Sequence, residues 1–275
     1  MLLSLTLLAT LASSSAGVPA PTHTAVAASQ DDAKKGPTEE QVSAALKAID
    51  VAFGSKEDKP NDRIAAVQSA EAVVHPKVID AVAKALTDDN LEVRAAALEA
   101  LSRMRHDDAL AALLAFGKKQ KKALWKDEDR YVAFLKAVAR HEAPSTIGFF
   151  STKLFDHKVQ AVASARILSL GRIRTTESID ALMDSMRQAN AKRVQGHMKD
   201  YRLALVVLTG QDNDLDPERW HKWWRANKKT FEVPEKMAPM EKDLYQRWNR
   251  FWGGANLYER NPRRDERGQD PEDGK

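Results

Sequence analysis

The chain has 275 residues, of which 43 are Lys or Arg and 39 are Asp or Glu, so its formal net charge at pH 7 is +4. It contains no cysteine, which excludes a disulfide framework, a thiol nucleophile and a lipid-anchored lipoprotein. The 12 glycines and the scarcity of alternating apolar runs argue against a β-sheet protein.

The N-terminal segment predicts a signal peptide and leader over residues 1–28. Leu2 to Ala12 is apolar, but it is shorter than the roughly 18–20 residues that span a bilayer. Small residues at Ser14–Ala16 and at Val26–Ala28 offer cleavage sites. No Lys or Arg precedes the apolar run, so a misassigned start codon or a non-functional leader stays open. We expect a periplasmic or secreted protein without a transmembrane span.

Residues 78–104 are the clearest unit of the chain, with two predicted helices joined by a polar turn. In the first helix Val78, Val82 and Leu86 recur at the spacing of a helix that buries one face. The second helix has a wider apolar stripe of small residues, which lets helix axes approach closely. Such a hairpin cannot bury both stripes alone, so it needs stacked neighbours of the same kind.

The second helix of this unit also carries a family resemblance. Asp89-Asn90-Leu91-Glu92-Val93-Arg94, followed by Ala96-Ala97 and Ala100-Leu101, resembles the second-helix signature of HEAT repeats. The resemblance implies an all-α fold, a right-handed α-α superhelix of the HEAT/armadillo-like solenoid type. It also implies that Asp and Arg side chains tie adjacent repeats together. The matching positions are Asp62, Arg63, Asp89, Arg94, Asp129, Arg130, Asp200 and Arg202.

Similar paired segments predict about five helical hairpins over residues 38–211. Thr38 begins the first one, with Gln41 placed to complete a capping box. The third hairpin is predicted to contain a lysine-rich loop, Gly117 to Lys122, and the fifth a longer basic loop, Gln188 to Lys199. The fourth hairpin lacks the arginine of the repeat and is interpreted as degenerate.

Residues 212–232 predict a tryptophan-rich capping helix. Asp216 is placed as its N-cap, with Pro217 at the first helical position. The segment resembles the closing segment of secreted bacterial HEAT-repeat proteins. Its tryptophans either cover the apolar end of the solenoid, or leave indole surface open to stack on a sugar or to grip a peptide.

Residues 233–258 predict an aromatic amphipathic helix, in which Leu244, Trp248 and Trp252 share one face. It either docks on the solenoid or is presented to a partner's helix groove or to a membrane surface. Residues 259–275 mix charges of both signs with Pro and Gly, and they predict a disordered tail.

No catalytic, metal-binding or cofactor-binding residues are predicted, because the sequence lacks G-x-S-x-G, P-loop and H-E-x-x-H motifs. An enzymatic alternative is a HEAT protein of the bilin-lyase-like or DNA-repair-like kind, but the sequence offers no candidate catalytic residue for it. We expect a non-catalytic protein-protein interaction scaffold of the cell envelope or secreted space, which binds a protein partner through the concave surface of the second helices.

Two other classes of ligand stay open. The tryptophan helix suggests a glycan or envelope polymer, and the basic loops suggest nucleic acid or another polyanion, although acidic residues are interleaved throughout. The candidate binding residues are Trp220, Trp223, Trp224, Trp248, Trp252, Lys118, Lys119, Lys121 and Lys122.

Overall fold

The structure is a computed structural model that describes residues 36–55, 57–189 and 191–253. The described residues from Pro37 onward belong to one compact unit. They form helices, turns and irregular segments with no strand, which confirms the all-α prediction. The predicted leader (1–28) and the predicted tail (259–275) lie outside the described residues. Within those limits, no helix combines the length and apolar character that a membrane span requires.

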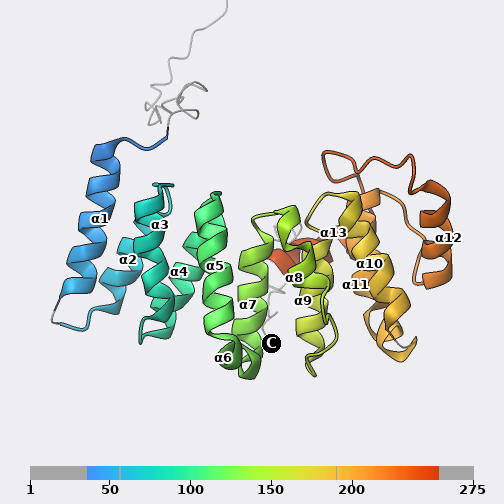
Figure 1. Ribbon diagram of the computed structural model, residues 1–275, viewed down its shortest axis with the longest axis horizontal. Coiled ribbons are helices and arrows are strands. Elements are labelled where there is room, and N and C mark those ends of the chain that lie inside the picture. Colours follow the sequence, from blue (N-terminus) through green and yellow to red (C-terminus); the bar gives the residue numbers. More distant parts are fainter. Residues whose placement is uncertain (1–35, 56, 190, 254–275) are drawn as a thin grey trace, which may run out of the picture. The chain divides into compact units, whose positions relative to one another are not determined.

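The helices pair in chain order and form two rows (Figure 1). The first-helix row consists of α1 (Glu39–Gly54), α3 (Pro76–Lys84), α5 (Asp107–Lys119), α8 (Ile147–Ser151), α10 (Thr176–Gln188) and α12 (Pro217–Asn227). The second-helix row consists of α2 (Pro60–Ala70), α4 (Leu91–Arg103), α7 (Glu128–Ala139), α9 (Gln160–Leu170) and α11 (Ala191–Thr209). Every second helix packs against the next one along the chain, which confirms a helical solenoid.

Three short elements complete the hairpins. The 3-10 turn η2 (Ala85–Thr87) follows α3, and the 3-10 turn η3 (Pro144–Thr146) precedes α8. The short helix α6 (Lys121–Lys126) lies between α5 and α7 in the chain. After α12 the chain crosses to α13 (Lys242–Trp252). Gly253 ends α13 in the left-handed region with φ 76°, a conformation that glycine adopts without the cost of a Cβ.

Local capping explains where several helices begin. Thr38 accepts a hydrogen bond from the Gln41 backbone at 3.2 Å, and the Gln41 side chain accepts one from the Thr38 backbone at 2.8 Å. This is the predicted capping box, which is confirmed. At α12 the Asp216 side chain accepts hydrogen bonds from the backbone of Glu218 and Arg219, as predicted for an N-cap followed by proline.

The core of the second-helix row is built from small and branched side chains, including the fully buried Val67, Val93, Ala97 and Val138. Small side chains allow a close approach, as at Gly171, which follows α9 and lies against α11. A Cβ added at Gly171 would lie 2.8 Å from the Cα of Ala204. Only glycine fits there without a shift of the backbone.

The predictions of basic loops at Gly117–Lys122 and Gln188–Lys199 are wrong, because most residues of both segments are helical. Lys118 and Lys119 form the last turn of α5, and Lys121 to Lys126 form α6. In the other segment α11 begins at Ala191 rather than near Asp200. Lys, Arg, Gln and Ala are good helix formers, so a basic run between two apolar stripes extends a helix rather than interrupting it.

At the end of the solenoid, α12 packs against α10 and extends the first-helix row. The Trp224 indole donates a hydrogen bond from Nε1 to Asp180 Oδ1 of α10 at 2.8 Å. The Trp220 indole is fully buried and donates from Nε1 to the Asp214 carbonyl at 2.9 Å. These contacts favour the interpretation of α12 as a cap.

Candidate binding surface

Helix α13 is the red helix of Figure 1. It lies on the second-helix row, where its rings contact Lys136 of α7 and Arg172, which follows α9. Arg140 donates from Nη2 to the Trp252 carbonyl at 3.3 Å. The Arg172 guanidinium lies 4.8 Å from the Trp252 ring centre, and the Lys136 ammonium lies 4.3 Å from that of Phe251. The aromatic face of α13 is therefore held by cations over its rings.

The middle of α13 forms an ion pair with α11. Arg247 of α13 donates from Nη2 to Asp200 Oδ1 at 2.6 Å. Just before α13, Glu241 lies 3.3 Å from the guanidinium of Arg202, which also binds Asp212 with two nitrogens. The intramolecular docking of α13, one of the two predicted alternatives, is what the structure shows.

Asp200 is the centre of a buried polar cluster under α13. Ser164 of α9 donates to Asp200 Oδ2 at 2.6 Å, and His197 Nδ1 lies 3.3 Å from the same oxygen. Burial raises the pKa of Asp200, but hydrogen bonds from His197 and Ser164 and the charge of Arg247 outweigh burial, so the pKa is lowered from its usual value. The cluster therefore keeps a carboxylate charged inside the protein.

This cluster differs from the triad of a serine nucleophile. In such a triad the serine hydroxyl and the carboxylate bind opposite nitrogens of the imidazole. Here Ser164 bonds directly to Asp200, and the same His197 nitrogen lies 3.3 Å from both of them. The geometry holds the carboxylate for Arg247 and does not activate the hydroxyl.

The structure separates the predicted tryptophans into two groups. Trp220 and Trp224 are buried in the cap, where Trp223 is half-buried against Phe231. Trp248 and Trp252 are each 8% exposed and belong to the docked α13. Their ring faces are covered by the protein itself, so these four buried indoles offer no open stacking platform.

The predicted lysines lie apart from both groups. Lys118, Lys119, Lys121 and Lys122 are exposed on α5 and α6, next to the first-helix row. The five predicted tryptophans and the four predicted lysines therefore do not form one surface. The cations that contact α13 are Lys136 and Arg172, which face its rings, and Arg140, which binds the Trp252 carbonyl; sequence reasoning missed all three.

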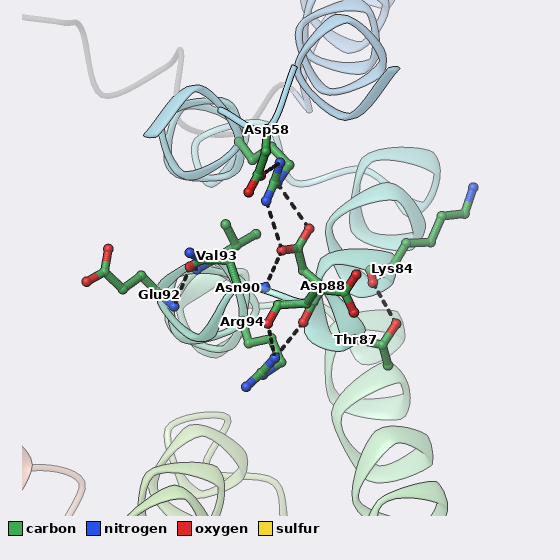
Figure 2. Close-up of polar contacts among 10 residues, drawn as sticks. Asp58, Lys84, Thr87, Asp88, Asn90, Glu92, Val93 and Arg94 are labelled. Carbon is green, nitrogen blue, oxygen red and sulfur yellow. Dashed lines mark hydrogen bonds and ion pairs between the residues drawn. The ribbon is translucent and has the colours of Figure 1, made fainter. Parts of the chain in front are cut away.

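One tie between hairpins was predicted with the wrong acid. The carboxylate that binds Arg63 of α2 belongs to Asp88, at 3.1 Å from Nε, and not to Asp89 (Figure 2). Asp88 also accepts from the Asn90 backbone at 2.9 Å, while Arg94 donates to the carbonyls of Asp88 and Asp89. The turn before α4 is thus linked to α2 on one side and to α4 on the other.

The remaining repeat positions do not follow one pattern. Asp62 and Asp129 are exposed acidic residues in the first turns of α2 and α7. Arg130 lies over the Phe116 ring, 5.7 Å from its centre. Burial, together with the nearby charge of Arg94, lowers the pKa of Arg130. Each hairpin junction has its own polar contacts.

A family comparison agrees with the second-helix signature. Residues 54–132 match the family model for HEAT repeats. The match runs from the end of α1 into α7 and includes the Arg63–Asp88 tie. No curated protein matches the chain. HEAT repeats are generally protein-interaction scaffolds, and within the part of the chain that the structure describes no group of His, Asp and Glu side chains is arranged to hold a metal ion.

Proposed function

We propose that the protein is a non-catalytic scaffold that binds an amphipathic helix of a protein partner on its second-helix row. The observation that carries this proposal is α13, a helix of the same chain that occupies this row with its aromatic face buried. A surface that accepts one amphipathic helix provides the groove chemistry that another helix can use.

The contacts of α13 define what such a partner helix would carry. Leu244, Trp248 and Trp252 are buried on one face, and the cations of α7 and α9 suit aromatic rings at the end of that face. The carboxylate of Asp200 suits a basic residue near the middle of the helix. A matching partner helix has aromatic residues at helical spacing and one Arg or Lys, as α13 does.

The docking of α13 also leaves a defect that favours displacement. Trp252 Nε1 is buried and has no hydrogen-bond partner among the described residues. An unsatisfied buried donor costs about 1–3 kcal/mol. A partner helix that satisfies the Arg140 and Arg172 side of the groove without this cost would replace α13.

The test uses a labelled peptide with the sequence of residues 241–253 and the full-length chain. Replacing Trp248 and Trp252 by Ala detaches α13 and opens the groove, so the peptide should bind this variant at least about tenfold more tightly than the wild type. Arg250→Ala, on the exposed side of α13, is the matched control and should bind like the wild type.

Two results would count against the scaffold proposal. The first is failure of the peptide to bind the opened variant although hydrogen exchange shows that α13 is released, which would mean that the groove holds α13 only through the covalent connection. The second is a pull-down in which the opened variant recovers no more protein from an extract than the wild type does. The first result would show that the groove is not a binding site for a separate helix, and the second that the extract contains no protein partner for it.

We place this scaffold in the periplasm or outside the cell. The support is the apolar Leu2–Ala12 segment with its small-residue cleavage sites. Fractionation of cells that express the full chain should recover a protein shortened at its N-terminus in the periplasm or medium. Recovery of the intact chain with cytoplasmic markers would contradict this placement.

A further inference from the structure

A cleft of about 680 Å³ is lined by residues of α5, α6, α7, α8 and α9. Beside it, α8 is a helix of only five residues, and the short helix α6 adds its side chains next to α5 and α7. Small-molecule sites in proteins have volumes of about 300–1,000 Å³. The cleft has the size of a site for a small organic ligand.

The walls of the cleft are largely aromatic. They include Trp125 of α6, Tyr131 and Phe134 of α7, and Phe149 of α8. Trp125 is 39% exposed, which makes it one of the few large apolar side chains on the surface of the described residues. A flat apolar body can stack on these rings and bury them further.

The position of Trp125 is fixed by a histidine. His157 accepts a hydrogen bond at Nδ1 from the Val159 backbone at 3.1 Å, so its Nε2 is the nitrogen that donates to the Trp125 carbonyl at 3.0 Å. The His157 ring also packs edge-on against the Trp125 ring, with 4.6 Å between the two ring centres. The indole is therefore preorganised and does not need to be ordered when a ligand binds.

Cations surround this aromatic lining. Lys118, Lys121 and Lys153 lie at the cleft, with Asp156 as the one acid among its lining residues. Arg166, which is 9% exposed, donates to the Thr152 carbonyl at 2.8 Å and to the Tyr131 hydroxyl at 3.3 Å. Neither Lys118, Lys121 nor Arg166 forms an ion pair with a carboxylate among the described residues. Lys153 lies 3.8 Å from Asp156, so the other cations leave the cleft with a net positive charge.

We propose that this cleft binds a small amphipathic organic anion, with an aromatic or acyl body and one acidic group. The body lies against Trp125, Tyr131 and Phe149, and the acidic group lies toward Lys118 and Lys121. The site is separate from the groove under α13, so it adds a small-molecule ligand to a protein-binding scaffold. Arg166 is a positioning residue, because it holds the carbonyls at the end of α8.

The test compares two fluorescent probes on the purified full-length chain. The first is 1-anilinonaphthalene-8-sulfonate, and the second is N-phenyl-1-naphthylamine, which has the same aromatic body without the sulfonate. We expect one saturable site that prefers the anionic probe. Lys118→Gln with Lys121→Gln should weaken binding of the anion about fivefold and leave the neutral probe unchanged.

The same lysine run supplies the matched control. Lys119 and Lys122 are also exposed, but they do not line the cleft, so replacing both by Gln should leave both probes bound. Gly148→Leu fills the cleft from α8 and should abolish binding of both probes. A Cβ at Gly148 meets no atom within 4 Å, so this variant is expected to fold, and its melting temperature checks that it does.

Two outcomes would overturn the proposal. If the Lys119 and Lys122 pair matters as much as the Lys118 and Lys121 pair, the probe reads only the general positive charge of the surface. If the probes still bind to Gly148→Leu and to Trp125→Ala, they occupy another place on the protein. Neither result bears on the groove under α13, whose peptide test stands separately.

Discussion

Arg247 of α13 lies 2.6 Å from Asp200 of α11, which is itself 5% exposed and bonded to Ser164. A buried charge is costly unless it is paired, and here the hydroxyl and the guanidinium supply the partners. The pair anchors the middle of α13, and the rings of Phe251 and Trp252 anchor its C-terminal end. The register of α13 on the second-helix row follows from these two anchors.

The Asp200 pair predicts a pH-dependent stability. The pKa of the Asp200 carboxyl is lower in the folded protein than the usual value of 3.8. The contribution of the charged carboxylate to stability is therefore fully present above pH 3.8 and is lost as the pH falls through the folded pKa. The free energy of unfolding of the wild type should exceed that of Asp200→Asn by about 1–3 kcal/mol near neutral pH. Urea unfolding between about pH 2.5 and about pH 7 should show the two curves converging at the acidic end. A gap that stays constant with pH would show that the charge of Asp200 contributes nothing.

Removing the other partner should loosen α13 without unfolding the solenoid. Arg247 has a half-exposed side chain, so Arg247→Ala should cost only about 1 kcal/mol. The expected sign is faster hydrogen exchange in α13 while exchange in α9 and α11 stays slow. Arg250→Ala, on the exposed side of the same helix, is the control and should leave exchange unchanged. Equal effects from the two variants would contradict the anchoring role of Arg247.

The tie between the first two hairpins predicts a difference between adjacent acids. Asp88 binds Arg63 and the Asn90 backbone, whereas the Asp89 side chain is exposed. Asp88→Ala should lower the free energy of unfolding more than Asp89→Ala does, because it removes one ion pair of Arg63, which keeps Asp58 at 2.9 Å, and the acceptor of the Asn90 backbone N–H. Asp89→Ala should change it by less than about 0.5 kcal/mol. Thermal unfolding of both variants measures the difference, and equal values would restore the Asp89 assignment.

Local sequence chemistry predicts much of this fold but little of its tertiary polar contacts. The Thr38 capping box and the Asp216 N-cap depend on residues within three positions, so the sequence is sufficient for them. The apolar stripes also predict which helices pair. The loop prediction for Gly117–Lys122 is wrong because it rests on charge alone, although lysine favours a helix.

The candidate groove and the cleft could not be predicted in the same way. Asp200 meets Arg247 across 47 positions, and Arg140 meets the Trp252 carbonyl across 112. No periodicity relates residues so far apart in the chain. The cleft depends on the short α8 and the inserted α6, whose lengths are set by helix ends that sequence patterns locate least well. The aromatic face of α13 is visible in the sequence and predicts that this helix docks on some surface, but the sequence does not show which surface.

The approach of α9 to α11 predicts that two glycines respond differently to alanine. At Gly171 the new Cβ would lie 2.8 Å from the Ala204 backbone, so Gly171→Ala forces the two helices apart and should cost about 1–3 kcal/mol. At Gly148 the new Cβ meets nothing within 4 Å, and Gly148→Ala should be neutral or stabilise by up to about 1 kcal/mol. Denaturant unfolding measures both. A harmless Gly171→Ala would mean that the second-helix row is packed more loosely than the structure shows.

The cap formed by α12 predicts a large effect of a single tryptophan. Trp224 is 5% exposed, its ring stacks near Trp223, and its Nε1 binds Asp180 of α10. Trp224→Ala removes this apolar contact and leaves the Asp180 carboxylate with Lys228 as its remaining partner, so it should cost about 3–5 kcal/mol. The melting temperature should fall by roughly 10 °C. Lys222→Ala on the exposed side of α12 is the control and should leave the melting temperature unchanged. If Trp224→Ala melts like the wild type, α12 does not stabilise the end of the solenoid.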